Sequence, residues 1–371
     1  MMLRVRWIAL VVMTAALCFG SRVVSVAPAA DQPAVPAAAA AALAVDDVDR
    51  AVARAMTFLR SQQRADGAIT TGPNPHATTA LAVLAMAATG RQITDPGVDG
   101  QAMRRAVLYL LSDGRQSKDG YFGEDGSRMY GHGVVTLALA ELVGMGASEQ
   151  EDALIRARCQ RGIDLIVASQ RVAKAAGQRG GWRYEPRSTD SDLSVTVWQV
   201  MALRAARNAG LDVPTDVIDE AVAYLRRCYF SPRDAAGNPT LAVSGFAYQP
   251  GGPPTYSMAA AGLLSLQVCG RRDIPEARGA VDWLLANRPA PSANWFLYGT
   301  YYFAQGMYQA SGDGSADAQA WVRQQLLPQQ SSSGSWSATN GGENQGGLIY
   351  TTTMAVLSLS VKYHYLPIYQ R

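Results

Sequence analysis

Amphipathic and uniformly apolar segments alternate along most of this 371-residue chain. The alternation is typical of paired helices, in which a segment with charge along one side is followed by a Gly-containing turn and an almost uncharged segment. Residues 48–61 and 215–229 are amphipathic, whereas residues 76–89 and 256–269 are apolar on every side. A helix that is apolar all round has to be buried, and an amphipathic helix is suited to cover it.

The helix pair recurs six times, and five of the six copies end at a glycine. The closing glycines are Gly90, Gly146, Gly210, Gly270 and Gly312, and the sixth pair runs close to the C-terminus. A closed ring buries all six apolar helices, whereas an open solenoid would leave one row of them in water. The sequence therefore predicts an all-α fold, a single (α/α)6 toroid over residues 46–371 with inner and outer helix rings.

The first residues carry the pattern of a targeting segment. Residues 1–30 combine a basic start (Arg4, Arg6), an apolar core over 7–19 and small residues near the end, which is typical of a signal peptide. The core is too short for an ordinary membrane span. We expect export to the periplasm or the extracellular space; an uncleaved segment that holds the protein at a membrane is the alternative. Residues 31–45 form an Ala/Pro-rich linker.

Charge and cysteine content exclude several classes of function. The formal net charge is +3, and three of the positive residues lie in the first thirty, so the remaining chain is nearly neutral and gives no sign of nucleic-acid binding. Cys159, Cys228 and Cys269 are odd in number and widely spaced, which argues against a disulfide framework and favours small buried residues. The three histidines show no metal-ligand spacing, so no metal and no cofactor is expected.

Polar or aromatic side chains recur at one position of the apolar segments. In the first five copies the residue fourteen places before the closing glycine carries a hydroxyl or an imidazole, and the sixth copy offers a tyrosine at the matching place. These residues are His76, His132, Thr196, Tyr256, Tyr298 and Tyr350. The pattern predicts a polar-aromatic ring that lines a central cavity at one end of the toroid. The alternative is that helix starts simply tolerate polar groups.

One stretch resembles a known repeat. "RGIDLIVASQ", followed by "GGW" at 180–182, resembles the Q-W repeat of the squalene cyclase and prenyltransferase superfamily, and "QQSSSGSW" at 329–336 resembles it again. A weaker copy occurs in the first helix pair, where Ile69 replaces the Trp. The resemblance extends over all six copies and implies the α/α toroid of that superfamily.

Squalene-hopene-type cyclases resemble residues 180–203 most closely. They carry a Gly-Gly-Trp turn, an Asp-x-Asp-Asp motif and a Thr-containing helix with Trp; the chain has Asp190-Ser191-Asp192-Leu193, then Thr196 and Trp198. The resemblance implies that Asp192 protonates an alkene with Asp190 as its companion, in a terpene cyclase-like isomerase acting on an isoprenoid or another lipid. Leu193 replaces the last Asp of the motif, and the chain has one toroid where those cyclases have two domains.

Such chemistry needs a neutral carboxylic acid and aromatic faces that stabilise a cation. A carboxylate pair can share one proton, and we expect His132 or His76 to donate a hydrogen bond to it across the ring. Trp182 and Trp198 lie near the acids in the sequence and are expected at the cavity. The alternative is structural: Asp190 or Ser191 caps the following helix, and residues two apart point in roughly opposite directions.

Other functions remain open at this stage. The Asp-x-Cys zinc pair of protein prenyltransferases is absent, because Ala157, Arg226 and Gln267 precede the cysteines. A glycan-active toroid would need carboxylates from different copies, such as Glu124 or Asp125 with Asp190 or Asp192, or Glu343 on a lid. A non-catalytic toroid that binds a lipid, a protein or a cell-envelope partner is the main alternative. A second protein chain that completes the cavity and a peripheral membrane contact are further partners to test.

Overall fold

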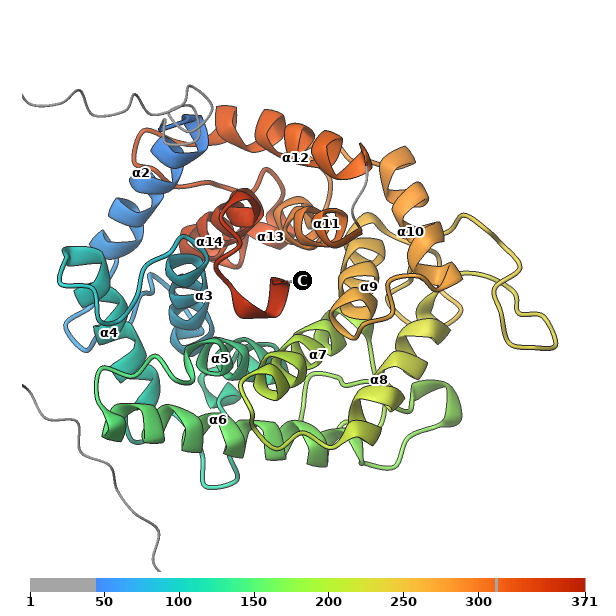
Figure 1. Cartoon of the computed structure of the whole chain (residues 1–371), viewed down its shortest axis with the longest axis horizontal. Coiled ribbons are helices and arrows are strands. Elements are labelled where there is room, and N and C mark those ends of the chain that lie inside the picture. The colour runs from blue at the N-terminus through green and yellow to red at the C-terminus, as the bar shows by residue number, and fades with distance from the viewer. Residues whose placement is uncertain (1–44, 311–312, 371) are drawn as a thin grey trace, which may run out of the picture. The chain divides into compact units, whose positions relative to one another are not determined.

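The computed structural model describes residues 45–310 and 313–370, which belong to one compact unit, Val45–Arg371. The predicted signal peptide and all of the predicted linker except Val45 lie outside the described residues. In the described part of the chain, six helices form an inner ring and six form an outer ring around it (Figure 1). The predicted all-α (α/α)6 toroid is therefore confirmed.

The two rings alternate along the chain. The outer helices are α2 (Asp47–Ser61), α4 (Val98–Leu111), α6 (Glu149–Gln170), α8 (Thr215–Cys228), α10 (Pro275–Ala286) and α12 (Asp313–Leu326). The inner helices are α3 (Pro75–Ala88), α5 (Arg128–Leu142), α7 (Leu193–Asn208), α9 (Tyr256–Val268), α11 (Phe296–Ala310) and α14 (Gly347–Leu359). Short helices lie between or after them: η1 (Gly123–Asp125), η2 (Ala176–Gln178), η3 (Leu327–Gln329), α13 (Gly341–Asn344), η4 (Ser360–Lys362) and η5 (Pro367–Tyr369).

Burial follows the sequence pattern. All residues of α9 after Tyr256 are buried, as expected of a helix that is apolar on every side. In α2 every apolar residue except Ala53 is buried, while Arg50 and Arg54 remain exposed. Each inner helix packs against its two inner neighbours, and contacts between α14 and α3 close the ring.

Glutamine side chains join one outer helix to the next. Gln170 donates one hydrogen bond to the Gly180 carbonyl in its own turn and another to the Val217 carbonyl in α8. The same pair of bonds is made by Gln63, Gln116 and Gln330. The last of these reaches Ala51 in α2, so the repeat also closes the outer ring. In the sixth copy the bonding residue is Gln330, the second glutamine of the Q-Q pair.

The turns after these glutamines need glycine. Gly180 has a φ of +83°, and a Cβ there would lie 2.0 Å from the Glu220 carbonyl oxygen of α8. Both the backbone conformation and the close approach exclude larger residues. The glycine that follows each of these glutamines is thus a requirement of helix-to-helix packing, whether it comes four residues later, as Gly67 does, or ten, as Gly180 does.

The C-terminal segment closes one end of the inner ring. Figure 1 shows it entering the middle of the ring, and η5 packs against α7. Tyr369 shares a hydrogen bond with Tyr301 of α11, and the Ile368 amide lies 3.4 Å from a carboxyl oxygen of Glu141 in α5. All four side chains are buried. This end of the toroid is filled with side chains.

Two further features follow from the sequence. Cys159 and Cys228 are buried free thiols and Cys269 is partly buried and free, in keeping with their expected role as small packing residues. Among the described helices, none combines the length and the apolar character needed to cross a membrane.

Candidate functional site

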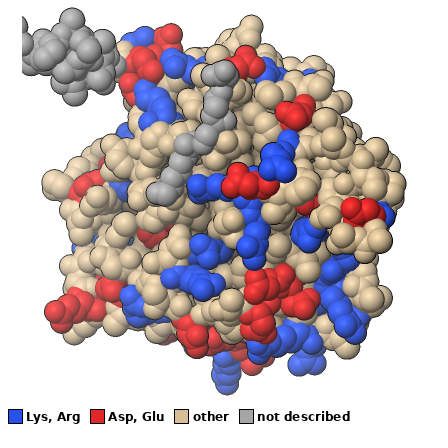
Figure 2. All heavy atoms as spheres, turned by 45° about the vertical axis from the view of Figure 1, so that its right-hand side comes forward, with Lys and Arg blue, Asp and Glu red and all other residues tan. Residues whose placement is uncertain are grey.

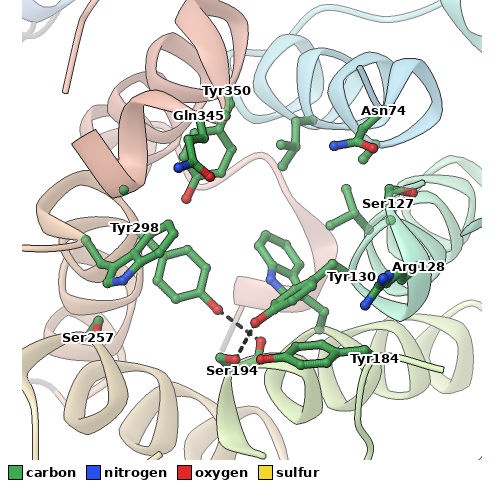
Figure 3. Close-up of a pocket in the computed structure, with 18 of the residues that line it drawn as sticks. Asn74, Ser127, Arg128, Tyr130, Tyr184, Ser194, Ser257, Tyr298, Gln345 and Tyr350 are labelled. Atoms are coloured by element: carbon green, nitrogen blue, oxygen red, sulfur yellow. Dashed lines mark hydrogen bonds between the residues drawn. The ribbon is translucent and has the colours of Figure 1, made fainter. Parts of the chain in front are cut away.

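A cavity of about 950 Å³ lies among the N-terminal halves of the inner helices (Figure 3). Aromatic side chains dominate its wall: Tyr130, Tyr184, Trp198, Tyr248, Trp295, Tyr298 and Tyr350. Leu81, Val134 and Met258 add aliphatic surface. Among the described residues that line the cavity, Arg128 carries the only formal charge, and it lies 3.3 Å from Glu185. The cavity suits a largely apolar ligand.

Asp192 lies directly behind this wall. It is the N-cap of α7, its side chain is fully buried, and its Oδ1 accepts hydrogen bonds from the Val195 amide (2.9 Å) and the Ser194 hydroxyl (2.7 Å). The predicted caps, Asp190 and Ser191, lie one or two residues too early, because the extended backbone at Asp192 pairs with Trp182 before the helix begins. Capping and a chemical role are compatible, since the cap itself needs only the hydrogen bond from the Val195 amide to Oδ1.

Hydroxyl groups connect Asp192 to the cavity on two sides. From Oδ1, the Ser194 hydroxyl continues to the Tyr130 hydroxyl at 2.5 Å. To Oδ2, Tyr248 donates a hydrogen bond of 3.0 Å, and the Tyr184 hydroxyl lies 2.5 Å from that of Tyr248. Ser194 and all three tyrosines line the cavity. Figure 3 shows Tyr130, Tyr184 and Ser194 gathered at one side of it.

Arg183 connects the two aspartates of the motif. One of its terminal nitrogens lies 2.7 Å from Asp190, and its Nε lies 3.1 Å from Oδ2 of Asp192. Its guanidinium also stacks over the rings of Tyr184 and Tyr248. The Asp190 side chain is 51% exposed. The two aspartates therefore interact through Arg183. They do not form the expected carboxylate pair that shares one proton.

The environment of Asp192 shifts the pKa of its carboxyl toward the neutral acid. Burial raises the pKa of its carboxyl, and this outweighs hydrogen bonds from Ser194, Val195 and Tyr248 and the charge of Arg183, which lower it. Burial also raises the pKa of Tyr130 and of Tyr248 well above the ordinary value of 10. The phenols are therefore neutral groups that can pass a proton but not hold a charge.

Three of the expected cavity residues, Trp198, Tyr298 and Tyr350, line the cavity. The other five need correction, since they lie outside the cavity wall: His76, His132, Thr196, Trp182 and Tyr256. One residue turns a helix by about 100°. In the second to fourth copies, Tyr130, Ser194 and Ser257 are among the residues that line the cavity, and each lies one or two positions away from the expected one.

The displaced residues hold the turns between outer and inner helices. Thr196 accepts a hydrogen bond from the Trp182 amide, and the Trp182 indole donates to the Ile166 carbonyl in α6. Tyr256 packs against Phe303 and Trp321 on the outer side. Their part is to join the two rings.

Neither histidine reaches the aspartates, which corrects the expected hydrogen bond across the ring. His132 Nε2 lies 3.1 Å from the Gly162 carbonyl, and its Nδ1 accepts from the Phe122 amide. Because a carbonyl only accepts, Nε2 carries the proton. Burial lowers the pKa of His132 to about 4. His76 lies 2.9 Å from the Phe122 carbonyl and supports the same turn.

The carboxylates required for glycan hydrolysis do not line the described cavity. Asp125 is buried and accepts hydrogen bonds from the His76 amide and from Ser127, which holds the turn before α5. Glu343 accepts from the Leu297 and Tyr298 amides and so caps α11. Both acids serve helix starts.

A sequence signal for the tyrosine pair exists but is easily overlooked. Tyr184 lies in "GWRYEP" and Tyr248 in "GFAYQP", so they occupy the same position of consecutive copies. Each follows the turn aromatic by two residues and precedes Pro by two. Comparison of the turns, rather than of the helices, identifies both residues.

Comparison with solved structures bears on the fold. The type II terpene cyclase MstE from Scytonema, in complex with merosterolic acid A, is 18% identical over 87% of this chain and 99% of that chain, with a TM-score of 0.54. A glycosidase is 12% identical over 86% of this chain and 98% of that chain, with a TM-score of 0.50. This is a squalene cyclase-like α/α-toroid fold. No protein-family model matches the chain, and no curated protein matches its sequence.

Proposed function

We propose that this toroid binds an isoprenoid-like lipid in its cavity and converts it by proton-initiated isomerisation or cyclisation, with Asp192 as the acid. The observation that carries the proposal is a fully buried Asp192 carboxyl, joined by hydroxyl groups to an aromatic-lined cavity. Neither a simple helix cap nor an apolar binding site requires this combination.

The wall of the cavity favours an apolar ligand. A volume of about 950 Å³ corresponds to roughly 30 water-sized groups. An isoprenoid of intermediate length fits this space. The complex of the terpene cyclase MstE with merosterolic acid A agrees with a lipidic ligand in a toroid of this fold.

The aromatic lining fits a reaction through carbocations. The face of an aromatic ring attracts a cation without forming a bond to it. Trp198 stacks on Tyr301 and meets Tyr302 edge to face, so its orientation is held by packing. Tyr298 is fixed by a hydrogen bond of 3.0 Å to the Ser194 carbonyl. A rigid aromatic wall is preorganised for charge that develops in the ligand.

Asp192 supplies the proton in this proposal. Its neutral form is favoured by burial, and the Arg183 guanidinium stabilises the carboxylate that remains once the proton has left. Asp190 acts on Asp192 only by positioning Arg183. Leu193, which replaces the last Asp of the related motif, is buried and begins α7.

Asp192→Asn tests the proposal because asparagine is as good an N-cap as aspartate but cannot supply this proton. We expect wild type to convert squalene or geranylgeraniol, and Asp192→Asn to lose about 100-fold or more of the rate with unchanged helix content. Asp190→Asn is the matched control and should reduce the rate much less. Product analysis by mass spectrometry and circular dichroism give the two readouts.

The opposite results separate the alternatives. Equal rates for wild type and Asp192→Asn would remove Asp192 from the chemistry. Saturable binding of both lipids without conversion would favour the non-catalytic lipid-binding toroid.

A further inference from the structure

Asp192 is connected to the same cavity through both of its carboxyl oxygens. Oδ1 meets Ser194 at 2.7 Å, and Ser194 meets Tyr130 at 2.5 Å. Oδ2 meets Tyr248 at 3.0 Å, and Tyr248 meets Tyr184 at 2.5 Å. Capping of α7 would use the Val195 amide alone. The second connection therefore has no function in starting the helix.

The two chains of hydroxyl groups end next to each other. The rings of Tyr130 and Tyr184 have centroids 5.9 Å apart and both line the cavity. The chains come from different elements: Tyr130 and Ser194 lie on inner helices, whereas Tyr184 and Tyr248 lie in turns. When one carbon of a bound ligand touches the Tyr130 hydroxyl, a carbon only a few bonds along the ligand can therefore touch the Tyr184 hydroxyl.

We propose that Asp192 both donates the proton and takes one back, through Tyr130 and Tyr184 respectively, so that the reaction is a double-bond shift between neighbouring carbons of the ligand. This inference rests on the proposed function and specifies its reaction class. No second acid or base is then needed. The absence of Asp and Glu from the described cavity wall agrees with a reaction in which one residue is both the acid and the base.

The position of Arg183 indicates which chain of hydroxyl groups donates the proton and which receives it. Its Nε lies 3.1 Å from Oδ2 and favours negative charge there, so we assign the proton of the neutral acid to Oδ1, which then donates to Ser194; in the carboxylate the Ser194 hydroxyl donates to Oδ1 instead. Oδ1 faces Ser194, which makes the chain through Tyr130 the donating one. The chain through Tyr248 and Tyr184 receives.

The proton balance closes on Asp192. The ligand double bond takes the hydroxyl proton of Tyr130, Tyr130 takes that of Ser194, and Ser194 takes the proton of Asp192, which leaves a carbocation and a carboxylate. A C–H bond next to the cation then breaks, and its electron pair forms the new double bond.

The proton released in that step returns to the acid. It passes to Tyr184, the Tyr184 proton passes to Tyr248, and the Tyr248 proton passes to Oδ2 of Asp192. The acid is neutral again, and a half-turn of the carboxyl group restores the starting arrangement.

The relay makes a prediction in D2O. The ligand receives the hydroxyl hydrogen of Tyr130, which lines the cavity and exchanges with solvent between turnovers. Wild type acting on geranylgeraniol should therefore place one deuterium in each isomerised molecule. Isomerisation without deuterium uptake would overturn the relay.

Removal of single hydroxyls distinguishes the two chains. Tyr130→Phe should lower the rate about 100-fold, since donation is lost. Tyr184→Phe should also slow consumption of geranylgeraniol, because Asp192 then regains its proton only from solvent, but unlike Tyr130→Phe it should yield a product that has gained water. Tyr121→Phe is the control, because the Tyr121 hydroxyl is buried, outside the cavity and without a hydrogen-bond partner in the structure.

A measurement without turnover gives a second test. The infrared carbonyl band that disappears in Asp192→Asn should shift in both Ser194→Ala and Tyr248→Phe. A carbonyl band whose frequency is unchanged in either variant would overturn the two-chain arrangement. Equal effects of Tyr130→Phe and Tyr184→Phe on rate and product would also overturn it, while an inactive Asp192→Asn would leave the proposed function standing. Activity in Asp192→Asn equal to wild type would instead refute both.

Discussion

The two ends of the inner ring are built from the same six helices but differ in kind. At the N-terminal ends, turns between the rings contribute Tyr184 and Tyr248, and a cavity remains. At the other end, Tyr369 and Ile368 of the C-terminal segment fill the ring against Tyr301. The inner ring is thus neither an open channel nor a uniformly packed core. One end holds the cavity with the candidate site, and the other end is filled by buried side chains.

The difference follows from the segments that enter each end of the ring. The connections from outer to inner helices include the long turns 171–192 and 229–255, and these turns place polar groups over the helix starts. Loops on a rigid scaffold are the usual carriers of binding and catalytic residues. Surface charge is shared between both signs on the face that Figure 2 shows, so it does not distinguish a binding face there.

The largest expected effect is at the packed end. Tyr369→Ala removes a buried ring and its contacts with Tyr301 and Met201, which should lower the free energy of unfolding by about 3–5 kcal/mol. Tyr365→Ala, four residues earlier and 55% exposed, is the matched control and should cost less than about 1 kcal/mol. Urea unfolding measures both. Equal losses would mean that the C-terminal segment does not seal the ring.

A smaller effect at the same end depends on pH. Burial raises the pKa of Glu141 from its ordinary value of 4.5 to about 8, so the folded chain holds an extra proton between these values and its stability falls as pH rises through that window. His132 acts oppositely below its ordinary value of 6.5, because burial lowers its pKa to about 4. Between pH 6.5 and 8, Glu141 therefore contributes more than His132 to the pH dependence of the free energy of unfolding.

Glu141→Gln isolates this contribution. The wild-type free energy of unfolding should decline more steeply between pH 6.5 and 8 than that of the variant, by at most about 1.4 kcal/mol per pH unit. Urea unfolding at several pH values gives the slopes. Parallel slopes for the two proteins would contradict a neutral Glu141 beneath the C-terminal segment.

The repeat pattern predicted the fold, because burial of uncharged helices leaves few arrangements. The site was harder to predict, since a helix turns by about 100° per residue and alignment on the closing glycines placed His132 and Thr196 where Tyr130 and Ser194 line the cavity. Asp192 was identified through its motif, but its connection through Tyr248 depends on a contact between residues 56 positions apart. Pairings over such distances are set by the packing of whole elements.

Mass spectrometry of lipids that co-purify with the protein tests the central claim most directly. Wild type and the Asp190→Asn/Asp192→Asn double variant would be purified in parallel and extracted. We predict an acyclic isoprenoid on the variant and its isomerised or cyclised product on wild type. Extracts that contain no isoprenoid from either protein would contradict a lipid-converting cavity and would leave Asp192 as the cap of α7.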